Sequence, residues 1–314
     1  MQFFKQEPRF DFMGGRKIAI AISLLMILVS IGALATRGLN FGLDFTGGTL
    51  IEVGYPQAVE LPPIRDALEK AGFKDAVVQH FGTAKDVLVR IAPQEGQNAN
   101  ALGDDVLKVL NELSNDEVKM RRQEFVGPQV GDELRDDGGL AMLIALGFIL
   151  VYVMARFEYR FALGSITALL HDVIITLGCF ALFQWDFDLT VLAAVLAVIG
   201  YSLNDTIVVF DRIRENFRKL RKVTPTEVIN RSLNQTISRT MMTSVTTLLV
   251  VAAMFTFGGE LIHSFSLALM IGVFVGTYSS IYIASTMALA LKITSASLIP
   301  VKKEGEDAEQ HMLP

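Results

Sequence analysis

The chain has 314 residues, of which 51% are hydrophobic and 19% are charged, and its formal net charge is −5. The charged residues are concentrated between long apolar stretches, a distribution that is typical of membrane proteins and excludes an ordinary soluble globular protein. A single cysteine, Cys179, excludes a disulfide framework within the chain.

Six apolar runs are long enough to cross a membrane, since a helix needs about 20 residues to span the hydrocarbon core. Runs of this length exclude β-strands, and only segments whose backbone hydrogen bonds are internally closed are stable in lipid. The sequence therefore predicts an all-α bundle of six transmembrane helices, which cover residues 18–36, 139–156, 162–183, 189–210, 241–258 and 264–291.

The first span has an alternative interpretation as a cleaved signal peptide. The Ala33-Leu34-Ala35 triplet resembles a signal-peptidase site that follows an apolar stretch. That stretch is longer than the roughly 7–15 apolar residues of a typical signal peptide. Its length favours an uncleaved membrane anchor.

Residues 37–138 separate the first two spans and have the composition of a water-soluble α+β domain. Alternation and turn residues predict strands over 49–54, 76–81, 86–91 and 118–126, and helical spacing predicts helices over 64–71 and 99–113. The order β-α-β-β-α-β is that of a ferredoxin-like domain. His80 has no ligand partner at metal-binding spacing, and Arg121-Arg122 is too short a basic patch for nucleic acid, so neither a metal nor a nucleic-acid site is predicted.

Lysine and arginine residues predict how the spans are oriented, because the short cytoplasmic loops of membrane proteins are enriched in them. The short segments 184–188 and 259–263 contain neither residue, whereas the segments that alternate with them are basic. The predicted cytoplasmic parts are therefore the N-terminus 1–17, a basic loop 211–240 and the tail 292–314, with 37–138 on the periplasmic side.

Two polar residues on neighbouring spans predict a proton-dependent switch. Asp205 lies inside the fourth span with Ser202 on the same helical face and Asn204 beside it, and Arg239 opens the fifth span with Thr243 on its face. Ionisable residues inside a membrane are functional candidates, since they are costly there. Burial favours the neutral form of a carboxyl group, whereas a nearby guanidinium favours the charged form. The alternative is a static ion pair that sets helix register.

A second intramembrane carboxylate, Asp172, lies near the middle of the third span and follows His171. Its depth makes the pair a second candidate for the proton pathway, although no basic partner is evident from the sequence. The chain contains no Gly-x-x-x-x-Gly-Lys-Ser/Thr phosphate loop and no arrangement of nucleophile and base, so no cofactor and no enzyme activity are predicted. Any work must then draw on a partner ATPase or an ion gradient.

Several motifs resemble those of the SecD/SecF family of bacterial secretion proteins. They are FGLDFTGGT at 41–49, VGPQVG at 126–131, HDV at 171–173, GYSLNDTIVVFDRIREN at 200–216, NQTISRT at 234–240 and GTYSS at 276–280. The last four are similar to the SecF branch rather than the SecD branch. The family motif residues in the first two are Asp44, Gly47, Gly48, Gly127 and Pro128.

The resemblance implies an auxiliary, non-enzymatic subunit of the Sec export machinery in the bacterial inner membrane. Members are expected to form a twelve-helix unit with SecD, similar to resistance-nodulation-division exporters, and to use the proton gradient for late preprotein translocation. The expected partners are SecD, the SecYEG channel with its accessory subunits, and exported preproteins in transient contact. The family's proton-pathway aspartate and arginine correspond to Asp205 and Arg239.

Two other functions remain open from the sequence. The chain could be a structural partner subunit without its own proton coupling, or a half-size exporter of the same superfamily. An exporter needs a large substrate cleft outside the membrane, for which a domain of about 100 residues leaves little room. The coupling ion, proton or sodium, is also left open.

Overall fold

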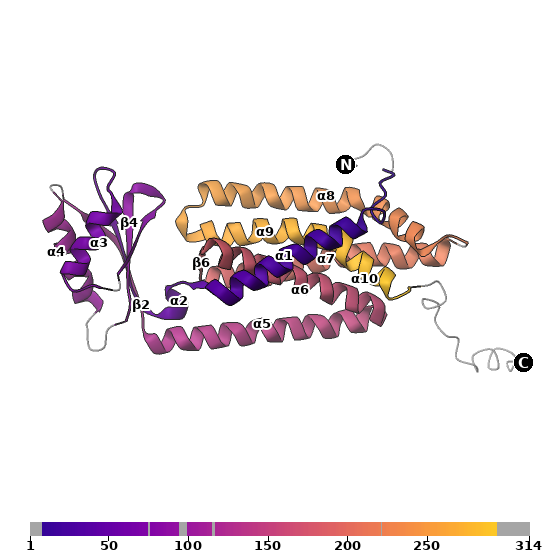
Figure 1. Cartoon of the computed structure of the whole chain (residues 1–314), viewed down its shortest axis with the longest axis horizontal. Helices are drawn as coiled ribbons and strands as arrows, with labels where there is room; N and C mark the ends of the chain where they lie inside the picture. The colour runs from indigo at the N-terminus through magenta and orange to yellow at the C-terminus, as the bar shows by residue number, and fades with distance from the viewer. Residues whose placement is uncertain (1–7, 75, 94–98, 115–116, 221, 294–314) are drawn as a thin grey trace, which may run out of the picture.

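The structure, a computed structural model, describes residues 8–74, 76–93, 99–114, 117–220 and 222–293 of the chain. Six long apolar helices form the larger part of it. The helices lie side by side, and a small sheet with two helices lies beyond one end of the bundle (Figure 1). They are α1 (Arg16–Arg37), α5 (Pro128–Arg156), α6 (Tyr159–Phe183), α7 (Leu189–Lys219), α8 (Pro225–Phe257), and α9 (His263–Ser279), which continues through a π turn (Ser280–Ala284) into α10 (Ser285–Ala290).

The predicted basic loop 211–240 is wrong as a loop, because both adjoining helices extend into it. Helix α7 continues to Lys219, and α8 already begins at Pro225. The Thr224 side chain caps α8 by accepting the backbone N–H of Glu227. Asn216 of α7 also donates to Ser232 of α8 at 2.9 Å, which joins the two extensions. Basic composition predicts the side of the membrane but not the secondary structure.

The same correction applies to the carboxyl end of the predicted 37–138 domain. Helix α5 begins at Pro128, so the segment up to Gly138 belongs to a continuous helix of 29 residues rather than to the extramembrane fold. Pro128 occupies the first helical position, where a missing N–H carries no penalty. The charged first turns extend the apolar span without interrupting it.

The extramembrane elements follow the order that the sequence predicts. They are β2 (Gly48–Gly54), α3 (Leu61–Lys70), β3 (Val77–Phe81), β4 (Thr83–Ile91), α4 (Ala99–Leu113) and β5 (Lys119–Val126). The strands form an antiparallel sheet in the order β3-β4-β2-β5. Alternate residues of the central strands, among them Ile51, Val53, Val87 and Val89, pack with Leu68 of α3 in a core of their own.

A small parallel ladder that the sequence does not predict joins two segments outside the six predicted spans. Strand β1 (Asn40–Phe41) pairs with β6 (Asp186–Phe187), and the short helix α2 (Leu43–Thr46) follows β1. The Asn40 side chain donates to Asp186 at 2.6 Å, which adds to the pairing. Strands of two residues carry no periodic pattern, so sequence reasoning cannot detect them.

The six helices differ in how much they contact one another. About half of the apolar stretch is buried in α6, α7 and the α9–α10 segment (56%, 56% and 50%), against 22% in α1, 6% in α5 and 17% in α8. Small residues allow the close contacts: a Cβ on Gly272 of α9 would lie 2.1 Å from Val198 of α7. The bundle thus has a central layer of α6, α7 and α9, and three peripheral helices with exposed apolar faces.

Candidate functional site

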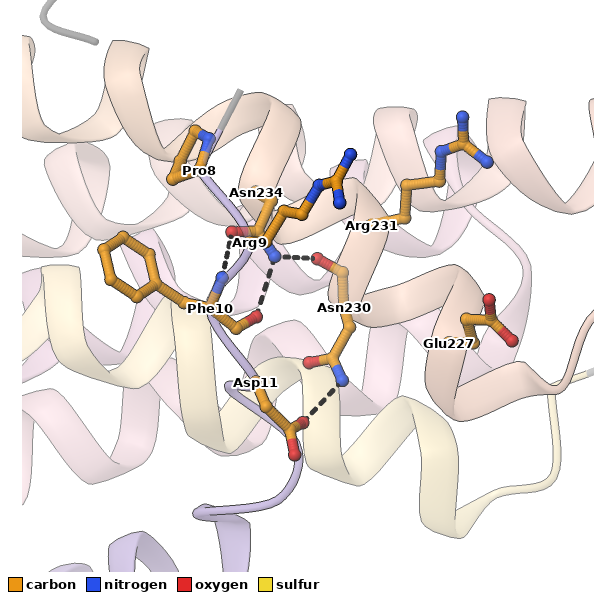
Figure 2. Close-up of a pocket in the computed structure, with 8 residues that line it drawn as sticks. All are labelled: Pro8, Arg9, Phe10, Asp11, Glu227, Asn230, Arg231 and Asn234. Atoms are coloured by element: carbon orange, nitrogen blue, oxygen red, sulfur yellow. Dashed lines mark hydrogen bonds between the residues drawn. The ribbon is translucent and has the colours of Figure 1, made fainter. Parts of the chain in front are cut away.

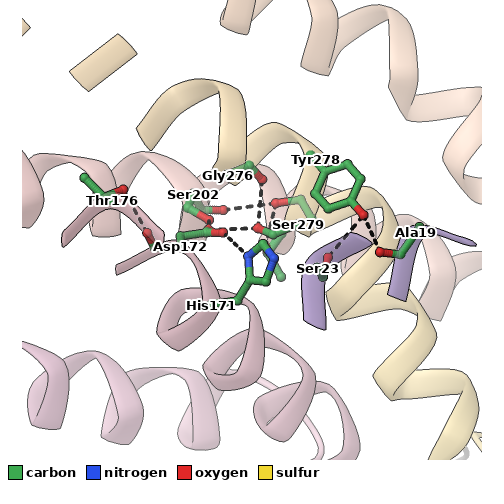
Figure 3. A network of polar contacts seen from close by, with 11 residues as sticks. Ala19, Ser23, His171, Asp172, Thr176, Ser202, Gly276, Tyr278 and Ser279 are labelled. Atoms are coloured by element: carbon green, nitrogen blue, oxygen red, sulfur yellow. Dashed lines mark hydrogen bonds and ion pairs between the residues drawn. The ribbon is translucent and has the colours of Figure 1, made fainter. Parts of the chain in front are cut away.

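The most extensive polar network inside the bundle centres on Asp172, whose side chain is fully buried in α6 (Figure 3). Its Oδ2 accepts hydrogen bonds from Ser202 of α7 at 2.5 Å and from Ser279 of α9 at 2.8 Å. Its Oδ1 lies 2.9 Å from the Nδ1 of His171. One carboxylate therefore connects all three central helices.

The backbone of α9 brings these groups together. Gly276 lies where α9 passes α7, and a Cβ there would lie 3.0 Å from the Cβ of Ser202. The π turn follows directly after Ser279, and Ser280, its first residue, hydrogen-bonds to Thr206 of α7 at 2.8 Å. Single π turns inside α-helices occur frequently at functional sites. Ser279 at the end of α9 thus contacts Asp172, and Ser280 at the start of the π turn contacts the helix turn that carries Asp205.

His171 extends the network towards the peripheral helix α1. Its ring stacks on Tyr278 with the centroids 6.2 Å apart, and the Tyr278 hydroxyl donates to the carbonyl of Ala19 at 2.6 Å. Ser23 of α1 in turn donates to the Tyr278 hydroxyl at 3.1 Å. The Nε2 of His171 is buried and has no hydrogen-bond partner among the described residues.

Sequence reasoning missed Ser279, Tyr278 and Ser23 as parts of this network. Isolated hydroxyl residues in an apolar helix give no signal by themselves, because such side chains usually donate to their own helix. The GTYSS motif at 276–280 contains two of the three residues and was the available indication.

Asp205 lies on α7 and is 3% exposed. Its Oδ2 has no hydrogen-bond partner within the part of the chain that the structure describes. The buried hydroxyl of Thr240 on α8 lies close enough to act on this carboxylate, but the two groups do not meet hydrogen-bond geometry. Buried polar atoms are nearly always satisfied, so an unsatisfied carboxylate oxygen requires a functional or structural explanation.

Arg239 does not form an ion pair with Asp205 in the described part of the chain. The arginine is exposed, although its positive charge acts on the carboxylate from the adjacent helix. Helices α7 and α8 are nevertheless packed together, since Tyr201 donates to Ser244 at 3.2 Å and Ser244 contacts Thr277 of α9 at 2.6 Å. The structure therefore places the two predicted residues on neighbouring helices without a direct bond.

Two further residues that the sequence predicts for the proton pathway lie outside the site. Asn204 is exposed on α7. Thr243 donates to the carbonyls of Arg239 and Thr240 within its own helix, at 3.2 and 2.9 Å. On a helix, the residues next to a functional residue in the sequence point in other directions, since successive residues are rotated by about 100°.

The glycine motif forms a joint between the sheet and the bundle. Gly47 has a φ of +65°, and a Cβ there would lie 2.9 Å from the Cα of Pro128 at the start of α5. Asp44 accepts the backbone N–H of Leu189 at 3.0 Å and so stabilises the first turn of α7. Arg90 of the sheet donates to the carbonyl of Phe41 at 2.9 Å. The motif therefore has a structural basis, which is to fix the sheet against α5 and α7.

The remaining motif glycines, Gly48 and Gly127, lie at the starts of elements at this joint. Gly48 has a φ of +121° and begins β2, and Gly127 precedes α5. No group of three or more His, Cys, Asp or Glu side chains suited to a metal ion occurs among the residues covered by the structure.

The fold and the buried polar network define a multi-pass membrane protein with ionisable groups in its central helices and a small extramembrane sheet. Residues 105–294 match the family described as protein export membrane protein SecD/SecF, C-terminal, and residues 32–59 match the SecD/SecF GG motif. The chain belongs to the SecD/SecF family.

Relatives over the full length are of the SecF type. The chain is 52% identical over 313 residues to the protein translocase subunit SecF of Vibrio alginolyticus, covering 100% of this chain and 99% of the relative. It is 54% identical over 291 residues to the SecF of Pseudomonas aeruginosa, with coverages of 92% and 94%.

Solved structures of SecDF are similar in fold. SecDF of Thermus thermophilus, described as a translocon-associated membrane protein, superimposes with a TM-score of 0.83 at 40% identity. A SecDF structure in a super-membrane-facing form gives a TM-score of 0.69 at 41% identity. Both comparisons cover 92% of this chain, which spans 40% of the length of either SecDF chain.

Proposed function

We propose that this chain is a SecF-type subunit of the Sec translocase that acts with SecD and uses the proton gradient to promote late preprotein translocation. The full-length relatives are named protein translocase subunit SecF. The similar SecDF chains are more than twice as long as the matched part, which leaves room for a SecD portion. We therefore propose SecD as the direct partner. The further proposed partners are SecYEG, its accessory subunits and preproteins.

The observation that carries the proposal is the buried Asp205 carboxylate with an unsatisfied oxygen and an arginine charge on the adjacent helix. A buried charge without full compensation favours proton uptake, and an approaching guanidinium favours proton release. Arg239 is exposed in this conformation, so its movement towards Asp205 is the proposed switching step. One proton crossing the membrane supplies about 2.3 kcal/mol per 100 mV, enough to shift a two-state equilibrium roughly fifty-fold.

The His171–Asp172 pair is the proposed second element of the proton pathway. Its neighbours, Ser202 and Ser279, are neutral hydroxyl donors to the carboxylate. A pair that shares one proton has no net charge in the low-dielectric interior, whereas loss of this proton leaves an uncompensated negative charge. The pair contacts α7 and α9 from α6, so a movement of any of these helices changes its hydrogen bonds.

The proposed arrangement in the membrane has both chain ends in the cytoplasm. The basic residues of the α7–α8 hairpin and of the N-terminus support a cytoplasmic position, and residues 37–138 are then periplasmic. The strand order β3-β4-β2-β5 supports a ferredoxin-like class for the extramembrane part. The predicted ranges 1–17, 37–138, 211–240 and 292–314 are retained only to assign each segment to one side of the membrane.

Asp205→Asn tests the proton switch, because the amide keeps the side-chain volume and loses the titrating group. We expect normal membrane abundance and normal assembly with SecD, together with a loss of gradient-stimulated preprotein export in membrane vesicles. Asn204→Ala on the exposed face of the same helix serves as the matched control and retains export. Wild-type export by Asp205→Asn across imposed gradients would instead favour the structural-subunit alternative.

A further inference from the structure

The chain segment that precedes α1 lies along the first turns of α8 and is bound there by side-chain amides (Figure 2). Asn234 accepts the backbone N–H of Phe10 at 2.8 Å and donates its Nδ2 to the carbonyl of the same residue at 2.8 Å. One amide side chain thus satisfies both backbone groups of Phe10. A neighbouring β-strand makes hydrogen bonds of the same kind.

Asn230, one helical turn earlier, binds the next part of the segment. It accepts the backbone N–H of Met13 at 2.9 Å and donates to the carboxylate of Asp11 at 2.7 Å. Asp11 also accepts the N–H of Gly14, and these two hydrogen bonds hold the pKa of its carboxyl group below the ordinary value of 3.8. Asp11 therefore remains ionised, and a good acceptor, at neutral pH.

Apolar side chains attach the same segment to the rest of the bundle. Met13 is 1% exposed and belongs to the main hydrophobic core, and the Phe12 ring packs edge-on against Tyr282 at 6.3 Å. Tyr282 lies in the π turn that follows α9. The segment therefore bridges α8 and the end of α9 that carries the serine contacts.

The position of α8 depends strongly on such contacts at its end. The buried residues of α8 lie mostly between Val228 and Thr240, and only 17% of its apolar stretch is buried, so the helix is held mainly by contacts of its first half. Arg239 follows Asn234 by five residues on the same helix, about 7.5 Å along its axis. A displacement of the α8 end is thus transmitted to Arg239 through a rigid helix.

We propose that Asn230 and Asn234 form a binding site for a peptide backbone, and that its occupation by residues 10–13 of the same chain positions α8 and with it Arg239. Both asparagines are positioning residues, since they do not contact Asp205. The positioning role rests on the proposed proton switch, whereas the binding site itself does not. Arg231, which lines the same groove, makes none of these backbone contacts and provides a matched control.

The experiment measures docking and export separately. Arg9→Cys and Arg231→Cys, both in the groove, are introduced together with Cys179→Ala, and a short bismaleimide reports whether the segment is docked. In this background Asn230→Ala with Asn234→Ala removes three backbone contacts and the Asp11 contact. We expect the initial crosslinking rate to fall at least tenfold, because the docked segment loses four hydrogen bonds. Gradient-driven export is expected to fall with it at unchanged membrane abundance.

Phe10→Pro is a second variant, because it deletes the donated N–H without changing α8. Crosslinking the asparagine variant to completion is expected to restore export, whereas Arg231→Ala alone leaves export at the wild-type level. An unchanged crosslinking rate in both variants would overturn the binding site. Loss of crosslinking with wild-type export would overturn the positioning role. The Asp205→Asn variant tests the proton switch separately from this experiment.

Discussion

Gly48 adopts a φ of +121°, and a Cβ at this position would lie 2.4 Å from the carbonyl oxygen of Ile91. The oxygen belongs to the backbone of a central strand, so it cannot turn aside as a flexible side chain could. Gly38 has a similar left-handed conformation, with a φ of +66°, but open space around the place of a Cβ. Substitutions at these two glycines therefore distinguish the effect of conformational strain from that of a steric clash.

Gly48→Ala is expected to destabilise the sheet by several kcal/mol, because it combines left-handed strain of about 1–2 kcal/mol with displacement of a paired strand. Gly38→Ala carries the conformational part alone. The measurement is hydrogen exchange of the β2 and β4 amides in the intact, detergent-solubilised protein. Equal protection in the two variants would contradict a steric role for Gly48.

At the residue scale, sequence reasoning selected the two buried carboxylates as candidates but did not predict all of their contacts. Asp172 and Asp205 stand out because a carboxylate in an apolar run is costly. The Ser202 and Ser279 contacts depend on which faces of α7 and α9 meet, which no local pattern specifies. Arg239 was expected to reach inward, and its exposed position follows from the open flank of α8.

At the element scale, the start of α7 is stabilised by two aspartates from different parts of the chain. Asp188, the residue before the helix, accepts the N–H of Val191 at 2.9 Å. Asp44 of the glycine motif accepts the N–H of Leu189 at 3.0 Å. An acceptor at a helix N-terminus satisfies an otherwise unpaired donor and interacts favourably with the helix dipole.

Asp44→Ala is therefore expected to destabilise the first turn of α7 by about 1 kcal/mol. Hydrogen exchange should accelerate about five-fold at the Leu189 amide, with little change at Val191. Asp188→Ala is the control, because it should reverse this pattern. If both variants accelerated the two amides equally, the separate roles of the two carboxylates would be wrong.

The long helices also show what periodicity can and cannot predict. Hydropathy locates each apolar core, yet α5, α7 and α8 extend well beyond it as helix. The extensions are stabilised by local contacts, such as the ion pairs of Glu215 with Arg212 and Lys219. Charged helical turns resemble charged loops in composition, and only capping and pairing distinguish them.

At the scale of the whole molecule, the proposed orientation can be tested by labelling, because the one native cysteine is removable. In a Cys179→Ala background, Lys108→Cys on exposed α4 should react with a membrane-impermeant maleimide after outer-membrane permeabilisation of whole cells. Lys219→Cys, at the exposed end of α7, should react only after the inner membrane is opened. Labelling of Lys219→Cys with the inner membrane sealed would reverse the orientation.

The exposed apolar faces of α1, α5 and α8 are likewise a property of the whole molecule. Burial in these helices is 22% or less, whereas the central helices reach at least 50%. Such faces are stable only against lipid or another membrane protein. They are consistent with a subunit of a larger helical assembly, which agrees with the longer SecDF chains.

The sequence by itself determined the number and type of the membrane helices, the order of the extramembrane elements and the candidate carboxylates. These depend on hydropathy, side-chain period and the cost of charge in lipid, which are local properties of the chain. Tertiary structure alone decided that Asp172 joins α6, α7 and α9, that Arg239 stays apart from Asp205, and that Phe10 pairs with Asn234. These contacts join residues distant in the chain, and their geometry arises only when the helices pack.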